Sequence, residues 1–133
     1  MNRTIRAQYV SSREETVTLI HAVLRACLER KPGEVCTVGL PGGRSIAPAV
    51  AALQLLDIRQ LTRLRFQLID ERLSGDKNYD TLLQAGFEQL FSKGFLKRSQ
   101  LTGLGIGQEH RTPPAGFDLV FLGIGEDGHA ASL

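Results

Sequence analysis

EVCTVGL, from Glu34 to Leu40, runs straight into the turn Pro41-Gly42-Gly43-Arg44-Ser45 and then into the alanine-rich stretch from Ala49 to Leu56. Apolar and β-branched residues that end at proline and glycine predict a buried strand followed by a turn. Pro48 is tolerated in a first helical turn, so we expect a helix to begin just after Ser45. Strand, glycine turn and helix in this order are the repeating unit of a parallel α/β sheet.

The same alternation extends on both sides of this unit. Before it, Ser11 or Ser12 with Glu14 or Glu15 forms a capping-box signature, and apolar residues at helical spacing predict a helix from Arg13 to Arg30. After it, the patterns predict a strand, a helix, a short strand and a last strand, at Leu64 to Ile69, Tyr79 to Phe91, Leu101 to Leu104 and Phe117 to Leu122. The last of these, FDLVFL, is nearly all apolar, which is typical of a strand covered on both faces. We therefore expect a single α/β domain over residues 1–133, with parallel strands in a three-layer sheet.

Composition limits the classes of function. The chain has 133 residues, 42% of them hydrophobic, and its 16 basic and 14 acidic side chains give a formal charge of +2. This balance creates no strong field, so we expect no binding to nucleic acid or to a membrane, and a bound anion must be held by a local site. The N-terminus MNRTIRAQYV lacks the apolar run of a signal peptide, and no apolar stretch is long enough to span a bilayer. A soluble cytoplasmic protein is expected.

Several residues that could carry chemistry have ordinary roles in this interpretation. Cys27 and Cys36 match no metal-ligand spacing and no disulfide framework, so buried free thiols are expected. His21 falls within the first helix and His110 in a polar stretch before two prolines, which favours structural or solvated roles. No aromatic residues interleave with the basic pairs for base stacking, so solvated faces are expected at Arg63 and Arg65 and at Lys97 and Arg98.

Three loops carry the chemically active residues, and each follows a predicted strand. Ligands of parallel sheets bind beyond the carboxyl ends of the strands, so we expect residues 41–45, 70–72 and 123–129 to meet at one edge. In the first loop, Gly42 and Gly43 would let backbone N–H groups approach an anion at a helix N-terminus, as in a phosphate cradle. A plain turn in which glycine only meets a positive-φ requirement explains the pair equally well.

The other two loops differ in what they indicate. Asp70-Glu71-Arg72 puts Arg72 at the edge with donors suited to phosphate, but any solvated loop contains such residues, and that is the simpler interpretation. Gly123-Ile124-Gly125-Glu126-Asp127-Gly128-His129 is more specific. His129 has an intrinsic pKa of about 6.5 and can take a proton near neutral pH, while Asp127 is near enough in sequence to orient its imidazole. We favour a catalytic role for His129.

Together, the three loops resemble motifs of the 6-phosphogluconolactonases. GIGEDGHAASL, from Gly123 to Leu133, is similar to their G-x-G-x-DGH-x-ASL-F motif, DER at residues 70–72 is similar to their second motif, and GLPGGRS looks like a variant of their first. The resemblance implies the Rossmann-like fold shared with glucosamine-6-phosphate deaminases and ribose-5-phosphate isomerases, with no metal or organic cofactor. It also implies a hydrolase of the pentose phosphate pathway that converts a small sugar phosphate, 6-phosphogluconolactone, to 6-phosphogluconate.

The resemblance further implies a role for each motif residue. His129, with Asp127 beside it in the catalytic motif, would act as general base and deprotonate a water molecule that attacks the C1 carbonyl of the lactone. The residues at the sugar-phosphate loop would be Gly42, Gly43 and Arg44. Asp70 and Arg72 would face the substrate, and Arg72 or nearby N–H groups would stabilise the developing oxyanion.

The sequence departs from the family pattern in three places. Pro41 replaces the usual serine before the two glycines, and the loop from Leu73 to Lys77 is abbreviated before Asn78-Tyr79. The chain stops at Leu133, inside the third motif, whereas the family continues through further strands, helices and basic substrate contacts. We therefore expect the N-terminal portion of a longer family domain, incomplete at its C-terminus. Such a portion would expose apolar strand surface, so a homo-oligomer that covers this surface is possible.

Two other functions stay open at this point. A glucosamine-6-phosphate deaminase/isomerase has the same fold and uses an aspartate at the position of Asp70 as base, but the residues after its DGH motif are Ile-Ala-Phe-Asn-Glu. Here His129 is followed by Ala-Ala-Ser-Leu, which favours the lactonase. A non-catalytic sugar-phosphate sensing domain would keep the phosphate loop without needing a base. No helix-turn-helix pattern precedes this domain, so the sensor is the weaker alternative.

Overall fold

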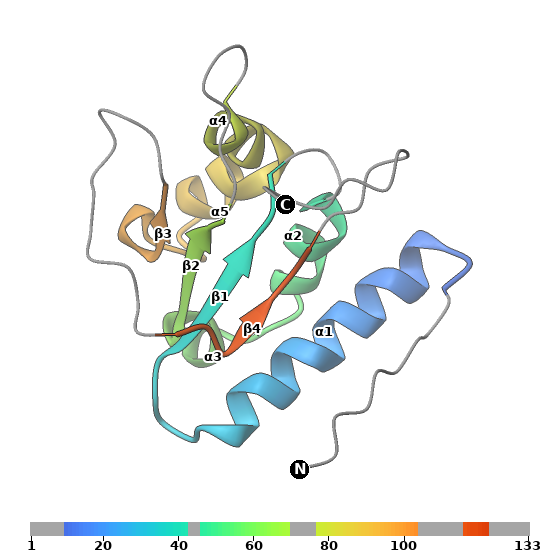
Figure 1. The fold of residues 1–133 in the computed structure, drawn as a ribbon, viewed down its shortest axis with the longest axis vertical. Coiled ribbons are helices and arrows are strands. Elements are labelled where there is room, and N and C mark those ends of the chain that lie inside the picture. Colours follow the sequence, from blue (N-terminus) through green and yellow to red (C-terminus); the bar gives the residue numbers. More distant parts are fainter. Residues whose placement is uncertain (1–9, 43–45, 70–76, 104–115, 123–133) are drawn as a thin grey trace.

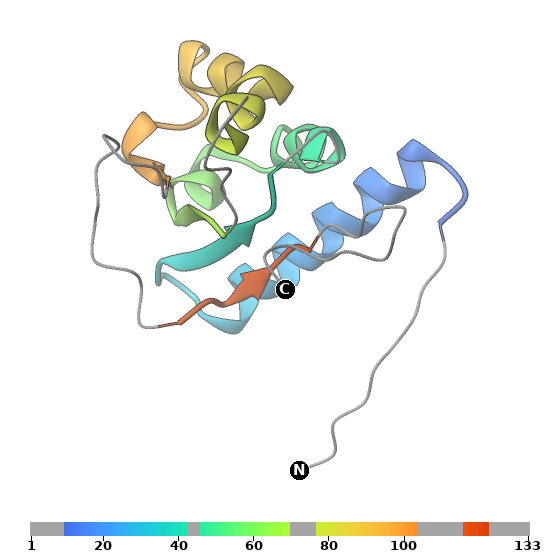
Figure 2. The ribbon, with the colours of Figure 1, turned by 45° about the horizontal axis from the view of Figure 1, so that its top comes forward.

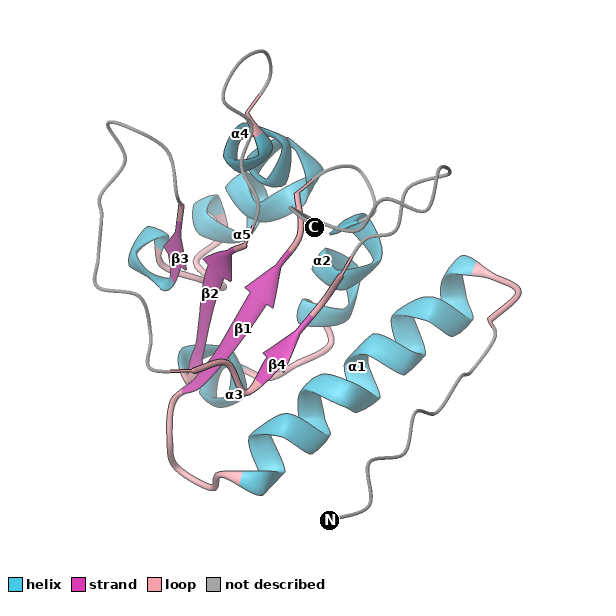
Figure 3. Cartoon of the chain, viewed as in Figure 1, coloured by secondary structure: helices cyan, strands magenta, loops and turns pink. Residues whose placement is uncertain are grey.

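Four parallel strands form one sheet in the order β3-β2-β1-β4 (Figures 1 and 3). The structure is a computed structural model that describes residues 10–42, 46–69, 77–103 and 116–122. The strands are β1 Cys36–Leu40, β2 Leu64–Leu68, β3 Leu101–Thr102 and β4 Leu119–Val120. β1 lies inside the sheet and pairs with β2 along its whole length, and with β4 through Val38 and Gly39. The predicted parallel sheet is confirmed.

Helices occupy the segments between the strands. Their bounds are α1 Arg13–Arg30, α2 Ala47–Leu53, α3 Ile58–Thr62, α4 Asn78–Leu82, the kinked segment η2 Leu83–Phe87, α5 Glu88–Ser92 and the 3₁₀ turn η3 Arg98–Gln100. α1 begins at the predicted residue. The Ser12 side chain accepts a hydrogen bond from Glu15 N–H at 3.1 Å, which is one half of a capping box, and the Glu15 carboxylate accepts from Ser11 N–H in place of Ser12 N–H. None of the described helices is both long and apolar enough to cross a membrane.

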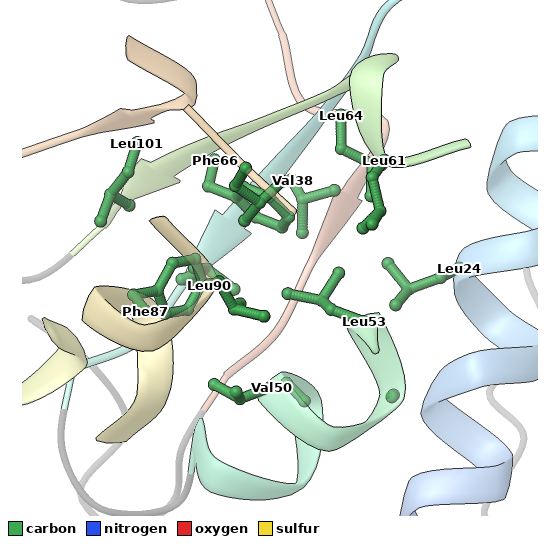
Figure 4. Packing of buried hydrophobic residues seen from close by; sticks show 14 of the residues in the cluster. Leu24, Val38, Val50, Leu53, Leu61, Leu64, Phe66, Phe87, Leu90 and Leu101 are labelled. Atoms are coloured by element: carbon green, nitrogen blue, oxygen red, sulfur yellow. The ribbon is translucent and has the colours of Figure 1, made fainter. Parts of the chain in front are cut away.

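The described helices cover one face of the sheet. Figure 2 shows α2, α4 and α5 on the same side of the strands, and α1 joins them by packing against α2. Side chains of this face make one apolar core, in which Leu24 of α1 and Leu53 of α2 meet Val38 of β1 and Phe66 of β2 (Figure 4). Phe66 and Phe87 stack edge to face with their ring centroids 5.5 Å apart. Two of the three expected layers, sheet and helices, are thus present in the described residues.

The opposite face of the sheet is largely open in the described part of the chain. Phe117, Val120 and Leu122 are 42%, 41% and 58% exposed, and β4 lies at the edge of the sheet. The predicted strand is present as β4, and Leu119 and Phe121 pack against the core, but the expectation that Phe117 to Leu122 is covered on both faces was wrong. The run is apolar, but its strand is short, has a neighbour on one side, and has no described helix over this face.

A glycine divides the helix predicted from Tyr79 to Phe91. Gly86 has φ 140°, a value that L-residues rarely adopt, and the chain forms α4, the kinked segment η2 and α5 in succession. A Cβ at Gly86 would lie 2.5 Å from Cγ1 of Val50 in α2. The absence of a side chain at Gly86 therefore lets this segment lie directly against α2.

Arg63 does not belong to a solvated face, contrary to expectation. Its Nε donates to Glu34 O at 2.9 Å, and its Nη2 donates to Leu28 O at 2.9 Å and also to Lys31 O. These carbonyls end α1 and lead into β1, so the guanidinium caps the helix and places a positive charge at its negative end. The expectation for Cys27 and Cys36 is confirmed, because both are buried free thiols.

Candidate functional site at the carboxyl edge of the sheet

The carboxyl ends of β1, β2 and β4 lie side by side at one edge of the sheet (Figure 1). Leu40 and Leu68, the last residues of β1 and β2, are direct partners, and Gly39 is the partner of Val120 at the end of β4. Main-chain hydrogen bonds continue this pairing beyond the strands, from Ile69 N–H to Leu40 O at 3.0 Å and from Phe121 N–H to Gly39 O at 2.9 Å. The three motif segments follow these strands in sequence, so the chain enters all three from the same edge.

Gly42 is the predicted site residue that falls within the described part of the chain. The others lie outside the described residues, namely Gly43, Arg44, Asp70, Arg72, Asp127 and His129. Their roles therefore stay predictions. The structure does locate the residues that precede the three segments, since Gly42, Ile69 and Leu122 are the last described residues before them.

Gly42 is in close contact with Asn78, the first residue of α4. A Cβ at Gly42 would lie 2.0 Å from Cγ of Asn78 and 2.3 Å from its Cβ and Nδ2. Gly42 is not among the glycines with positive φ. Gly42 therefore does not meet a positive-φ requirement, and its contact with Asn78 gives a packing reason for glycine that neither interpretation included. The phosphate cradle stays a prediction.

The helix after this turn receives no side-chain cap from the residue at its N-cap position. Ile46 at the N-cap position has no oxygen to offer, and the first turn of α2 contains no acidic residue. Pro48 lies in the first turn, where the missing N–H costs least. This part of the edge is therefore free of competing negative charge from α2, which suits an anion held nearby.

An ionic cluster at the opposite, amino edge fixes β4 against β1. Asp118 N–H donates to Thr37 O at 2.9 Å, and Thr37 N–H donates to Oδ2 of Asp118 at 2.8 Å. Lys31 Nζ lies 2.9 Å from Oδ1 of the same carboxylate. The hydrogen bond from Thr37 and then the bond to Lys31 lower the pKa of Asp118 below its ordinary value. The cluster sets the register of β4 and hence the point where the chain leaves it toward the DGH motif.

Sequence reasoning gave no role to Asn78. It is 6% exposed, and among the polar residues that the structure describes, Asn78 and Gln100 are the two that are buried. In the sequence, Asn78 stands out only as part of the Asn78-Tyr79 pair of the family pattern. That pair does not reveal that the side chain is buried or that it contacts the glycine turn. Within the described ranges, no three His, Cys, Asp or Glu side chains lie close enough together to hold a metal ion.

Comparison with known proteins identifies relatives of this arrangement. A family model described as glucosamine-6-phosphate isomerases/6-phosphogluconolactonase matches residues 11–133. The crystal structure of 6-phosphogluconolactonase from Thermotoga maritima has a similar fold, with a TM-score of 0.65 and 23% sequence identity over 89% of this chain and 60% of that chain. The chain thus spans 60% of the length of that enzyme. No curated protein sequence matches it.

Proposed function

Because the chain belongs to the family of glucosamine-6-phosphate isomerases and 6-phosphogluconolactonases, we propose that its reaction is the hydrolysis of 6-phosphogluconolactone to 6-phosphogluconate. The observation that supports this most is the shared edge of β1, β2 and β4, from which all three motif segments continue. The proposal takes residues 1–133 as one portion of the family domain, acting in the cytoplasm in the pentose phosphate pathway.

In the proposed reaction, the phosphate of the lactone binds at Gly42, Gly43 and Arg44. His129 takes a proton from a water molecule, which attacks the C1 carbonyl, and Asp127 orients the imidazole. The tetrahedral intermediate collapses with loss of the ring oxygen, which receives the proton as the acid product forms. Asp70 and Arg72 contact the sugar, and Arg72 supplies positive charge to the oxyanion. Because a lactone is already reactive, positioning and one base suffice, and no metal or organic cofactor is required.

The test is hydrolysis of freshly prepared 6-phosphogluconolactone, corrected for the spontaneous reaction. We expect His129→Ala to lower kcat by about 10²–10⁴-fold, the range of a positioned general base. His110→Ala is the matched control, because it removes an imidazole from a polar stretch outside the three motifs. Equal rates for the two variants, after both have been shown to fold, would contradict the assignment of the base.

The same samples separate the alternative functions. Release of ammonia from glucosamine 6-phosphate, without lactone hydrolysis, would identify a deaminase instead. Binding of sugar phosphate with no turnover of either substrate, unchanged in affinity by His129→Ala, would identify a sensing domain. The residues after His129 and the Asp-Glu-Arg triplet favour the lactonase over the deaminase, and the presence of the DGH motif favours it over a sensing domain.

A further inference from the structure

Asn78 links the glycine turn after β1 to the helix that follows the second motif. It is the first residue of α4 and is 6% exposed. Gly42 lies so close to it that a single added carbon would fall 2.0 Å from its Cγ. Two parts of the chain that are separated by α2, α3 and β2 are therefore in van der Waals contact at the carboxyl edge.

This contact brings together the ends of two motif segments. Gly42 immediately precedes Gly43 and Arg44, and Asn78 follows the segment that contains Asp70 and Arg72. A planar amide with two rotatable bonds, held in a buried site, fixes the neighbouring backbone more firmly than a longer or more exposed side chain would. The buried side chain of Asn78 therefore packs directly against the backbone at Gly42.

We propose that Asn78 is a positioning residue, whose side chain fixes the backbone at Gly42 and thereby sets the affinity of the glycine turn for phosphate. The inference rests on the proposed function, because it takes the turn after β1 as the phosphate site. Asn78 acts through the turn and does not contact the reacting carbon. A small displacement of a binding group is costly, because the geometry of a phosphate site depends on several N–H donors at once.

The first experiment compares Asn78→Ala with Gln100→Ala in the whole chain. Gln100 is the matched control because it is also a buried amide, 7% exposed, but its Nε2 donates to Leu61 O and Leu64 O beside the start of β2. Titration with inorganic phosphate, followed by calorimetry or by amide chemical shifts, gives the affinity. We expect Asn78→Ala to weaken binding by about 10–100-fold and to raise KM with little change in kcat, whereas Gln100→Ala lowers stability and leaves the affinity unchanged.

The second experiment tests the contact itself. Gly42→Ala should lower stability, because its methyl group collides with Asn78. Asn78→Gly removes the side-chain atoms of Asn78 with which that methyl group would collide. The double variant Gly42→Ala/Asn78→Gly should therefore be more stable than the sum of the two single effects predicts. Additive effects, or equal phosphate affinities for Asn78→Ala and Gln100→Ala, would overturn the inference.

The outcomes separate this inference from the proposed function. A chain whose phosphate affinity depends on Asn78 but that does not hydrolyse the lactone would support the inference and contradict the proposed reaction. A chain that hydrolyses the lactone, with a phosphate affinity that does not depend on Asn78, would do the reverse. A wild-type chain that neither binds phosphate nor hydrolyses the lactone overturns both.

Discussion

Replacement of Gly86 by alanine should be among the most costly single changes in the described part of this fold. Gly86 has φ 140°, and a Cβ there would lie 2.5 Å from Cγ1 of Val50. Backbone strain of a non-glycine residue in a sparsely populated region costs about 1–3 kcal/mol, and forced overpacking adds about 1–3 kcal/mol. We therefore expect Gly86→Ala to lower the free energy of unfolding by about 2–6 kcal/mol, a large share of the roughly 5–15 kcal/mol of a typical domain.

Gly94 is the matched control for this change. It also has a positive φ, 80°, but a Cβ there would meet nothing within 4 Å. Gly94→Ala therefore carries strain without a collision, partly offset by the reduced entropy of the unfolded chain, and should cost about 1–2 kcal/mol. The difference between the two variants measures the collision with Val50.

Urea denaturation followed by circular dichroism provides the free energies. In the Gly86→Ala background, Val50→Ala removes the colliding methyl groups and should recover about 1–3 kcal/mol relative to additive effects. A cost for Gly86→Ala no larger than that for Gly94→Ala, with no coupling to Val50, would refute the close approach of the kinked helix to α2.

Two further predictions concern side chains that hold the strands in place. Asp118→Asn should cost about 1 kcal/mol at pH 7, because the amide keeps an acceptor but loses the charge that Thr37 N–H and Lys31 stabilise. Since its folded-state pKa is lowered, the carboxylate contributes stability above its unfolded pKa of about 3.9, and this contribution is lost as the pH falls through the lower folded pKa. Wild type and variant should therefore converge in acid unfolding curves below about pH 4, and a constant difference down to pH 2 would count against the interaction. Arg63→Lys should cost about 1–3 kcal/mol in urea denaturation, because an ammonium cannot reach the three carbonyls that the guanidinium binds, and a neutral result would show that these bonds contribute nothing.

The sequence was sufficient for the parts of the fold that depend on local patterns. The capping box at Ser12 and the apolar spacing after it predicted α1 with its observed bounds. The β-branched run that ends at Leu40 predicted β1, and Leu64 to Ile69 predicted β2 with one residue more than the strand contains. Each of these signals lies within the element itself, so no tertiary contact was needed to find it.

The errors came from features that depend on distant neighbours. Gly86 looks tolerable in a helix until Val50 is seen beside it, and Arg63 looks solvated until the end of α1 is placed against it. The exposure of Phe117 could not be read from its own segment, because apolar composition does not reveal what covers a strand. α3 was missed although Asp57 and Gln60 form a capping box, a local signal that was available.

For the candidate site, the sequence predicted the edge and the structure supplies the neighbours. Parallel alternation was enough to expect three loops at one edge, and the pairing of β1 with β2 and β4 confirms that their carboxyl ends meet. The explanation for Gly42 required the position of Asn78, which no spacing rule encodes. The roles of Asp70, Arg72, Asp127 and His129 remain predictions from the motifs.

The attachment of β4 has a consequence for how the sheet opens. β4 is held by two paired residues, and its anchor Asp118 bonds to Thr37, which is 81 positions away in the chain. β4 pairs through two residues, whereas five pairs join β1 and β2, so the amide protons of β4 should exchange with solvent before those of β1 and β2. The DGH motif continues directly from this strand. A substrate that contacts both the first and the third motif would therefore stabilise the pairing of β4 with the sheet. Its binding energy would then contribute both to catalysis and to the stability of β4.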